Sequence, residues 1–313
     1  MIVTVTLNPA YDVTYTVGEF LVGRAHRVTA VHERVGGKGF NVARVLAVRG
    51  VPVVAVTFGD DEFEAGAQAL GFEVECVRGL NKIRRTLVVH DELGSTTSLW
   101  EPGHRVAAGA TEQLLSIVER RLPRTTGLVV AGSLARGVPA DLPALLAQAA
   151  VRSGVPVIVD ADDEALRLAA QVSGVVLMPN RDELARLAAS PIGHLDSVMS
   201  AVTQLVANGA GAVVATLGES GMVAADASGA WRAALDQPIE GNPTGAGDAA
   251  VAAAIAHLAK GEPRWPELLL DAIATSASAV GAPVAGEIDP RVRDRLLSQV
   301  RVSELHGPPR SFA

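Results

Sequence analysis

Short runs of Val, Ile and Leu alternate with amphipathic helical patterns along most of this chain, and this rhythm constrains the fold more than any other feature. The runs predict buried strands at residues 2–7, 53–58, 128–131, 155–159, 175–178 and 212–216. Apolar positions spaced as on one helical face predict helices around residues 114–122, 142–149 and 165–172. Because helices that connect successive strands are typical of parallel sheets, the pattern predicts a doubly wound α/β fold with a mostly parallel sheet covered on both faces.

Two segments break this rhythm, at residues 11–33 and 86–100, where β-branched and polar residues alternate without an intervening helix. The alternation predicts a small antiparallel sheet that forms a lid. The chain has no low-complexity linker and no internal repeat of 20 to 50 residues. We therefore expect residues 1–313 to form one domain that carries this lid.

The composition argues against several classes of protein. There are 27 Lys and Arg against 34 Asp and Glu, a formal net charge of −7, and the basic residues are dispersed, which disfavours a nucleic-acid-binding surface. The single cysteine excludes an internal disulfide and any multi-cysteine metal site. The longest stretch without charged side chains, residues 197–218, is too polar to span a membrane well. The first residues are typical of a strand rather than a signal peptide, so we expect a cytoplasmic protein.

The most informative motif is GNPTGAGD at residues 241–248, which precedes an alanine-rich helical run. Gly245, Ala246 and Gly247 allow close approach of a ligand, and their N–H groups at a helix start form an anion site. The same letters fit a dinucleotide-binding turn, but no buried strand precedes them, which disfavours that alternative. Asp248 is either a first-turn helix acid or a base that accepts a hydroxyl proton beside the anion site. The second arrangement suits phosphoryl transfer.

A second Gly-rich turn, VGGKGFN at residues 35–41, also opens a predicted helix. It lacks the spacing of a Walker A loop, and the chain lacks the signature triplets of protein kinases, so both mechanisms are set aside. The glycines alone are consistent with a tight strand-to-helix turn, but Lys38 and Asn41 add a cation and an amide that suit a phosphorylated, hydroxylated ligand. Residues 8–12 and 180–183 are compatible both with turn or cap residues and with ligand contacts.

Together these segments resemble the PfkB/ribokinase family of carbohydrate kinases, and within it the branch that contains 1-phosphofructokinase and tagatose-6-phosphate kinase. The resemblance runs nearly end to end. Its seven ordered motifs are TLNPAYD at 6–12, GGKGFNVA at 36–43, EPG at 101–103, GSLARGVP at 132–139, PNRDEL at 179–184, TLGESG at 216–221 and TGAGD at 244–248. The resemblance implies a ribokinase-like three-layer α/β/α sandwich with a β lid. It also implies Mg²⁺-dependent transfer of the γ-phosphoryl group of ATP to a sugar bound between lid and sheet.

The resemblance further implies roles for individual residues. Asp248 matches the base, and Gly245, Ala246 and Gly247 match the anion hole for the moving phosphoryl group. Contacts to the sugar are implied for Asp12, Gly36, Gly37, Asn41, Glu101 and Ser133. Contacts to the phosphate that the sugar already carries are implied for the three cations Arg27, Lys38 and Arg84. Contacts to the nucleotide are implied for Asn180, Glu183, Thr216, Gly218 and Gly221. Glu183 is also the implied Mg²⁺ ligand, through water.

Three positions depart from the usual pattern of this branch. Met178 replaces a lysine before Pro-Asn, which removes a contact to the phosphates of ATP. Thr86 and Trp100 replace asparagines on the predicted lid, near the sugar. Trp100 is expected either to pack near the apolar side of the sugar or to lie in the core of the lid. The departures bear on the identity of the substrate rather than on kinase chemistry.

The sequence therefore predicts an ATP-dependent kinase of a phosphorylated ketohexose, with fructose 1-phosphate ahead of tagatose 6-phosphate and fructose 6-phosphate. One alternative is a kinase of an unphosphorylated sugar or nucleoside, which Lys38 disfavours. Another is a sugar-phosphate-binding protein without turnover, which the complete TGAGD motif disfavours. The expected partners are a sugar phosphate and ATP, with neither nucleic acid nor membrane, and a homodimer through the lid.

Overall fold

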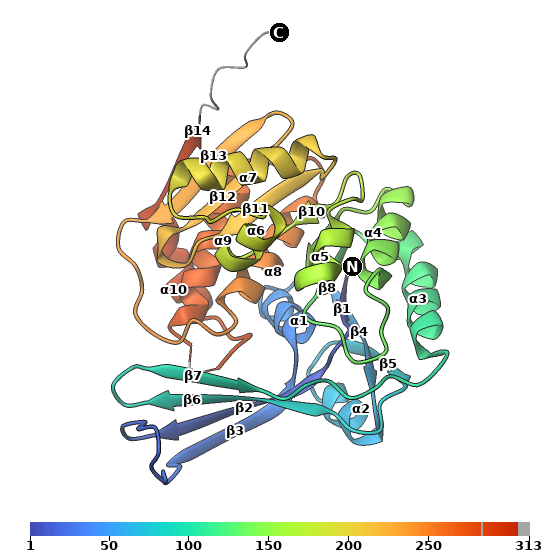
Figure 1. Ribbon diagram of the computed structural model, residues 1–313, viewed down its shortest axis with the longest axis vertical. Coiled ribbons are helices and arrows are strands. Elements are labelled where there is room, and N and C mark those ends of the chain that lie inside the picture. Colours follow the sequence, from blue (N-terminus) through green and yellow to red (C-terminus); the bar gives the residue numbers. More distant parts are fainter. Residues whose placement is uncertain (283, 306–313) are drawn as a thin grey trace.

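The computed structural model describes residues 1–282 and 284–305, and these residues form a large sheet between two layers of helices, with a second, smaller sheet at one end (Figure 1). The order of strands in the large sheet is β14-β13-β12-β11-β10-β9-β8-β1-β4-β5. Seven neighbouring strands pair in parallel: β1 (Ile2–Thr6), β4 (Val53–Gly59), β5 (Glu73–Arg78), β8 (Gly127–Ala131), β9 (Val157–Asp160), β10 (Val176–Leu177) and β11 (Ala212–Thr216).

The rest of the large sheet is an antiparallel edge made by β12 (Met222–Asp226), β13 (Gly229–Leu235) and β14 (Val300–Leu305). The predicted fold class, an α/β sandwich with a mostly parallel sheet, is confirmed. The sequence reasoning did not identify this antiparallel edge. Strands β12 and β13 are joined by a short turn rather than by a helix, and β14 pairs with β13 only after three α-helices have intervened, so these strands lack the regular strand-helix alternation on which the prediction rested.

Helices cover both faces of the large sheet. One layer contains α3 (Ala110–Arg121), α4 (Leu142–Arg152), α5 (Asp163–Ala169), α6 (Arg181–Leu187) and α7 (Leu195–Ala207). The other contains α1 (Lys38–Val48), α8 (Ala246–Leu258), α9 (Trp265–Val280) and α10 (Pro290–Leu296). Helix α2 (Asp61–Gln68) packs against β5 and the small sheet. No helix in the described part of the chain has the length and apolar character needed to cross a membrane.

The core of this layered body explains how α8 is held. Strands β1 and β8 are buried along their whole length. The alanine side chains of α8 from Ala249 to Ala256 are also buried, and because they are small the helix can pack closely against α1 and α9. The start of α8 is therefore fixed beside the start of α1, and both helix N-termini carry motifs that the sequence analysis singled out.

The small sheet contains β2 (Ala10–Val17), β3 (Ala30–Gly36), β6 (Arg84–Asp91) and β7 (Thr96–Trp100), in the order β3-β2-β6-β7. We call it the lid. Its hairpins β2–β3 and β6–β7 are antiparallel, but β2 and β6 pair in parallel. The expectation of a purely antiparallel lid was wrong in this respect. The chain passes through β3, α1, β4, α2 and β5 between β2 and β6, and such a long connection permits parallel pairing.

Candidate active site

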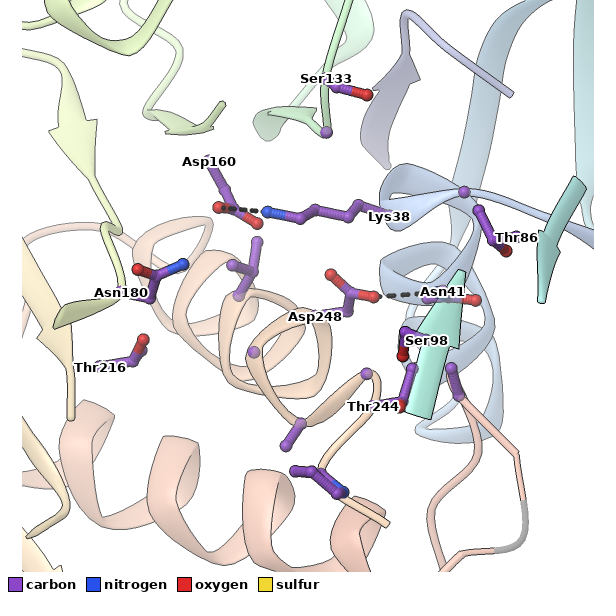
Figure 2. A pocket seen from close by; sticks show the side chains of 18 of the residues that line it. Lys38, Asn41, Thr86, Ser98, Ser133, Asp160, Asn180, Thr216, Thr244 and Asp248 are labelled. Atoms are coloured by element: carbon purple, nitrogen blue, oxygen red, sulfur yellow. Dashed lines mark hydrogen bonds and ion pairs between the residues drawn. The ribbon is translucent and has the colours of Figure 1, made fainter. Parts of the chain in front are cut away.

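A cavity of about 970 Å³ lies where the lid, the carboxyl ends of the parallel strands and the N-termini of α1 and α8 meet. Side chains from all of these elements point into it (Figure 2). Ligands of open α/β sheets bind at the carboxyl ends of strands, where helix N-termini also converge. The location therefore agrees with a site for a phosphorylated ligand.

The start of α8 forms one wall of the cavity. Gly245 has a φ of 84°, and a Cβ there would come within 2.9 Å of the Cα of Ala285, so this position requires glycine. The N–H of Ala246 donates to the carbonyl of Pro243 at 3.2 Å and is thus used in the turn. Gly247 and Asp248 follow in the first turn, where N–H groups have no acceptor within the helix. These two N–H groups are the donors best placed to bind an anion.

Asp248 is buried at the same helix start. The side-chain amide Nδ2 of Asn41, on α1, donates to Oδ2 of Asp248 at 2.9 Å (Figure 2). Burial raises the pKa of Asp248 to about 7, although the charge of Lys38 and the bond from Asn41 act in the opposite direction. A carboxyl group with this pKa can accept a proton near neutral pH, as a general base must.

Lys38 lies between several carboxylates. Its Nζ is 3.1 Å from Oδ1 of Asp160, which ends β9. Burial acts to lower the pKa of Lys38, but Asp160, Asp248 and Glu183 outweigh it and hold the pKa above its usual value. The ammonium group therefore stays charged in the centre of the site. Asp160 was not predicted as a site residue, although its place directly after the Val-Ile-Val run of β9 is a usable signal in the sequence.

Asp12 faces the cavity from the lid. Thr86 donates from its hydroxyl to Oδ1 of Asp12 at 2.6 Å, and the N–H of Gly37 donates to Oδ2 at 3.4 Å. Gly36 does not line the cavity, but a Cβ there would lie 2.1 Å from Oδ2 of Asp12. Gly36 thus leaves the space that the carboxylate occupies.

Arg84 belongs to a second polar group on the lid side. Its guanidinium donates to the carbonyl oxygens of Asn8 and Glu101, each at 3.3 Å. The amide of Asn8 donates to the hydroxyl of Ser133 at 3.0 Å. Burial lowers the pKa of Arg84, but an arginine keeps its charge at neutral pH. Arg84 and Ser133 both line the cavity and bring a cation and a hydroxyl to its lid end.

Asn180 and Glu183 form a capping box at the start of α6. The side chain of Asn180 accepts from the N–H of Glu183 at 2.9 Å, and Oε2 of Glu183 accepts from the N–H of Asn180 at 2.8 Å. Both residues nevertheless line the cavity. Burial raises the pKa of Glu183 to about 7, against the charge of Lys38. Asn180 and Glu183 therefore cap α6 and also face the cavity.

The turn after β11 completes this side of the cavity. The N–H of Thr216 donates to the carbonyl of Pro179 at 2.9 Å, which brings Thr216 beside Asn180. Gly218 and Gly221 have φ values of 62° and 88°. Thr216, Gly218 and Gly221 line the cavity together. The structure thus gathers the five residues that the resemblance assigned to the nucleotide.

Arg27, Gly36 and Glu101 lie outside the cavity lining. Arg27 is exposed on the loop between β2 and β3. The carboxylate of Glu101 accepts from the N–H of Arg85 at 2.8 Å and is thereby engaged at the lid edge. Trp100 lines the cavity and is 74% exposed, which rules out the alternative that it fills the core of the lid.

Further charged residues of the cavity were not anticipated from the sequence. Arg34 of β3 lines it and pairs with Glu287 at 2.9 Å. Arg186 of α6 also lines it, as do Met178 and Arg181, which belongs to the PNRDEL motif but received no role from the resemblance. In a sequence, isolated arginines on strands and helices look like solvated surface charges, so spacing gave no signal for them.

Three similar proteins bear on the chemistry of this site. The tagatose-6-phosphate kinase of Staphylococcus epidermidis is 28% identical, with 97% of this chain and 100% of that protein covered. The 1-phosphofructokinase of Xanthomonas campestris is 31% identical, with 82% and 83% covered. Phosphofructokinase-2 of Escherichia coli, solved in complex with fructose-6-phosphate, matches at 26% identity with a TM-score of 0.83, covering 95% and 98%. Its tetrameric inhibited form matches at 27% identity with a TM-score of 0.84 and the same coverage.

The model of the pfkB family of carbohydrate kinases matches residues 4–291, which include every motif discussed above. The match spans the lid, the parallel strands and the start of α8. This chain therefore belongs to the pfkB family of carbohydrate kinases.

Proposed function

We propose that this carbohydrate kinase transfers the γ-phosphoryl group of ATP to a hydroxyl of a phosphorylated ketohexose, with fructose 1-phosphate as the first candidate and fructose 1,6-bisphosphate as its product. The observation that carries the proposal is the buried carboxyl of Asp248, held by Asn41 beside the open N–H groups of α8. The names of the relatives support a sugar phosphate as acceptor. Tagatose 6-phosphate and fructose 6-phosphate are the next candidates.

In this mechanism the carboxylate of Asp248 accepts the proton of the acceptor hydroxyl. The hydroxyl oxygen then forms a bond to the γ-phosphorus, the bond from that phosphorus to its bridging oxygen breaks, and ADP leaves. The N–H groups of Gly247 and Asp248 stabilise the charge on the moving phosphoryl group. Phosphoryl transfer needs mainly such positioning and charge stabilisation.

The residues present fit a magnesium ion that is held chiefly by phosphates and water. Mg²⁺ in kinases is usually bound by one or two carboxylates together with substrate phosphates. Within residues 1–282 and 284–305, no cluster of three or more His, Cys, Asp or Glu would enclose a metal ion, which agrees with that mode. We propose Glu183 as the carboxylate that holds it, through water. Bound there, Mg²⁺ would neutralise the phosphate charge of ATP.

We propose that the phosphate already present on the sugar is bound by Arg84, Ser133 and Lys38. Arg84 and Ser133 share the lid end of the cavity through Asn8. Lys38 is paired with Asp160, and its flexible side chain must leave that carboxylate to reach a sugar phosphate. Asp12, Gly37 and Asn41 would then contact the sugar hydroxyl groups.

Exposed apolar side chains on the lid support the proposal of a homodimer. Of the ten large hydrophobic residues exposed among the described residues, seven lie on the lid strands and their turns: Leu21, Val22, Val28, Val31, Leu93, Leu99 and Trp100. A second lid would bury much of this surface. Arg27, on the same exposed loop, would then lie at the interface, where it can approach the partner's cavity. Light scattering is expected to give twice the chain mass.

A screen that couples ADP release to a range of acceptors tests the proposed function. A phosphorylated ketohexose is expected to give a kcat/KM at least about tenfold above that of the matching free sugar, because charge-assisted contacts of about 1.5–3 kcal/mol exceed the 1.4 kcal/mol that a tenfold ratio requires. Equal efficiency with free fructose would favour the free-sugar alternative. Binding without any turnover would favour the non-catalytic alternative.

A cytoplasmic location is proposed on the ground that ATP is the co-substrate.

The acid side of the pH profile is expected to report Asp248. The group must be ionised to act, so kcat/KM should fall as the pH drops below about 7, the pKa that burial gives Asp248. The hydrogen bond from Asn41 favours the ionised form, so Asn41→Ala should raise this pKa and move the acid limb to higher pH. Measurements of kcat/KM as a function of pH for the parent and for Asn41→Ala test this prediction. An acid limb that stays in place would show that Asp248 does not control it.

A further inference from the structure

The register of the lid strands places four side chains in one cross-strand row. Asp12 of β2 is paired with Arg34 of β3 and with Thr86 of β6, and Thr86 is paired with Trp100 of β7. Residues in register on adjacent strands lie on the same face of a sheet. All four line the cavity. This row, which we call the lid row, is therefore the surface that the lid presents to a bound sugar.

Asp12 is the only carboxylate of the lid row, and its closest hydrogen-bond donor is Thr86. The hydroxyl of Thr86 lies 2.6 Å from Oδ1 of Asp12, whereas the N–H of Gly37 lies 3.4 Å from Oδ2. A distance of 2.6 Å is typical of a strong bond from a hydroxyl to a carboxylate, and 3.4 Å is close to the limit for an N–H donor. Thr86 therefore does most to fix the orientation of this carboxylate.

The orientation of the Asp12 carboxylate needs to be fixed because two nearby guanidinium groups compete for its oxygens. Arg44 and Arg84 both lie within electrostatic reach of Asp12. Arginine readily forms two parallel bonds with a carboxylate. A carboxylate that turned toward either guanidinium would lose lone pairs that a sugar hydroxyl needs. The Thr86 bond occupies one lone pair of Oδ1 and the Gly37 N–H faces one of Oδ2, so each oxygen keeps a lone pair for a sugar hydroxyl.

We propose that Thr86 is a positioning residue that holds the carboxylate of Asp12 in the orientation in which it accepts hydrogen bonds from two neighbouring hydroxyl groups of the sugar. The proposal rests on the proposed function, because it takes a sugar phosphate as the ligand. It also gives a role to the threonine at position 86, where this branch of the family usually has asparagine. The Thr86 hydroxyl donates to Asp12 rather than to the ligand. The lid row therefore contacts the sugar through one fixed carboxylate and the indole of Trp100.

The test compares Thr86→Val, which removes the hydroxyl at nearly constant shape, with Thr86→Ser, which keeps it. The probe is fructose 1-phosphate, or the best acceptor of the screen, and its Kd is measured by calorimetry without ATP. Thr86→Val is expected to raise this Kd and the KM for the sugar phosphate at least about tenfold, with kcat and the KM for ATP within about threefold of the parent. Thr86→Ser is expected to stay within about threefold in all four quantities.

A double-mutant cycle separates positioning from a general effect on the lid. In an Asp12→Asn background, Thr86→Val is expected to change the Kd by less than about twofold, because the carboxylate that it positions is gone. Thr97→Val, on β7 but on the opposite face of the lid, is the matched control and is expected to leave the Kd unchanged. If Thr86→Val is poorly folded, Thr86→Ala takes its place in the cycle.

Two results would overturn the inference. One is a Kd for Thr86→Val within about twofold of the parent, and the other is an equal loss in the presence and absence of the Asp12 carboxylate. Because the Kd is measured without ATP, a parent that binds the sugar phosphate but fails to turn it over would refute the proposed kinase activity while the cycle still decides the role of Thr86.

Discussion

Asp248→Asn is expected to lower kcat by roughly 10²–10⁴, which is the usual contribution of a positioned general base. Asparagine has nearly the same size as aspartate and can still accept the bond from Asn41, but it cannot take a proton from the acceptor hydroxyl. The dissociation constants for the sugar phosphate and ATP are therefore expected to stay within a few fold. The free energy of unfolding should change by no more than about 1 kcal/mol.

Asp196→Asn is the matched control, because Asp196 is an exposed first-turn acid of α7 outside the cavity. Its kcat is expected to equal that of the parent. Steady-state kinetics on both variants, with binding measured by calorimetry, make the comparison. Turnover of Asp248→Asn within about threefold of the parent would reduce Asp248 to a helix-capping residue.

Asp271→Asn is expected to destabilise the protein by about 3–5 kcal/mol, the usual effect of removing one partner from a buried ion cluster. Asp271 of α9 is buried and accepts from Arg49 at 2.5 Å, Arg293 at 2.7 Å and His257 at 3.0 Å. Arg49 lies at the end of α1, His257 in the last turn of α8 and Arg293 on α10. The variant leaves Arg49 mostly buried without a counter-charge and leaves Arg293 with only the exposed Asp294.

Urea denaturation of Asp271→Asn and of Asp294→Asn measures this effect. Asp294 also pairs with Arg293, at 2.6 Å, but it is exposed, so its loss should cost no more than about 1 kcal/mol. Equal destabilisation by the two variants would contradict a special role for the buried carboxylate. Both variants keep the residues of the active-site cavity unchanged.

The same cluster gives stability a pH dependence of known sign. Burial acts to raise the pKa of Asp271, but His257, Arg49 and Arg293 outweigh it and hold the pKa below the ordinary value. A lowered pKa in the folded state means that the stabilisation is complete above the pKa of the unfolded chain, about 4, and is lost as the pH falls below it. Asp271→Asn should therefore show a weaker loss of stability between pH about 5 and about 2 than the parent.

The sequence predicted the layered α/β fold because its strands and helices differ in period and alternate in order. The parallel pairing of β2 with β6 was missed, since local alternation shows that a strand forms but not which partner it takes. The antiparallel edge of β12, β13 and β14 was missed because a short turn joins β12 to β13, whereas β14 returns to β13 only after three helices. The pairings β2–β6 and β13–β14 join residues far apart in the sequence, which local patterns do not reveal.

The site was predictable where glycines and polar residues form compact motifs. Gly245–Asp248 and Gly36–Asn41 stand out in the sequence because helix starts that bind anions need small residues there. Asp160, Arg34 and Arg186 lie outside the motifs quoted from the sequence and reach the cavity only through the packing of separate elements. The link between Thr86 and Asp12 depends on the same long-range pairing of β2 with β6 that the sequence left undetermined.

The most direct test of the account is to measure how much sugar bisphosphate forms for each ADP released, with phosphorus NMR on a reaction containing ATP, Mg²⁺ and fructose 1-phosphate. Transfer of the γ-phosphoryl group from ATP to a hydroxyl deprotonated by Asp248 predicts one fructose 1,6-bisphosphate for each ADP, and in Asp248→Asn the two signals should grow more slowly by the same factor, roughly 10²–10⁴. Release of ADP with inorganic phosphate and without a bisphosphate would contradict the account, because the γ-phosphoryl group would then have gone to water.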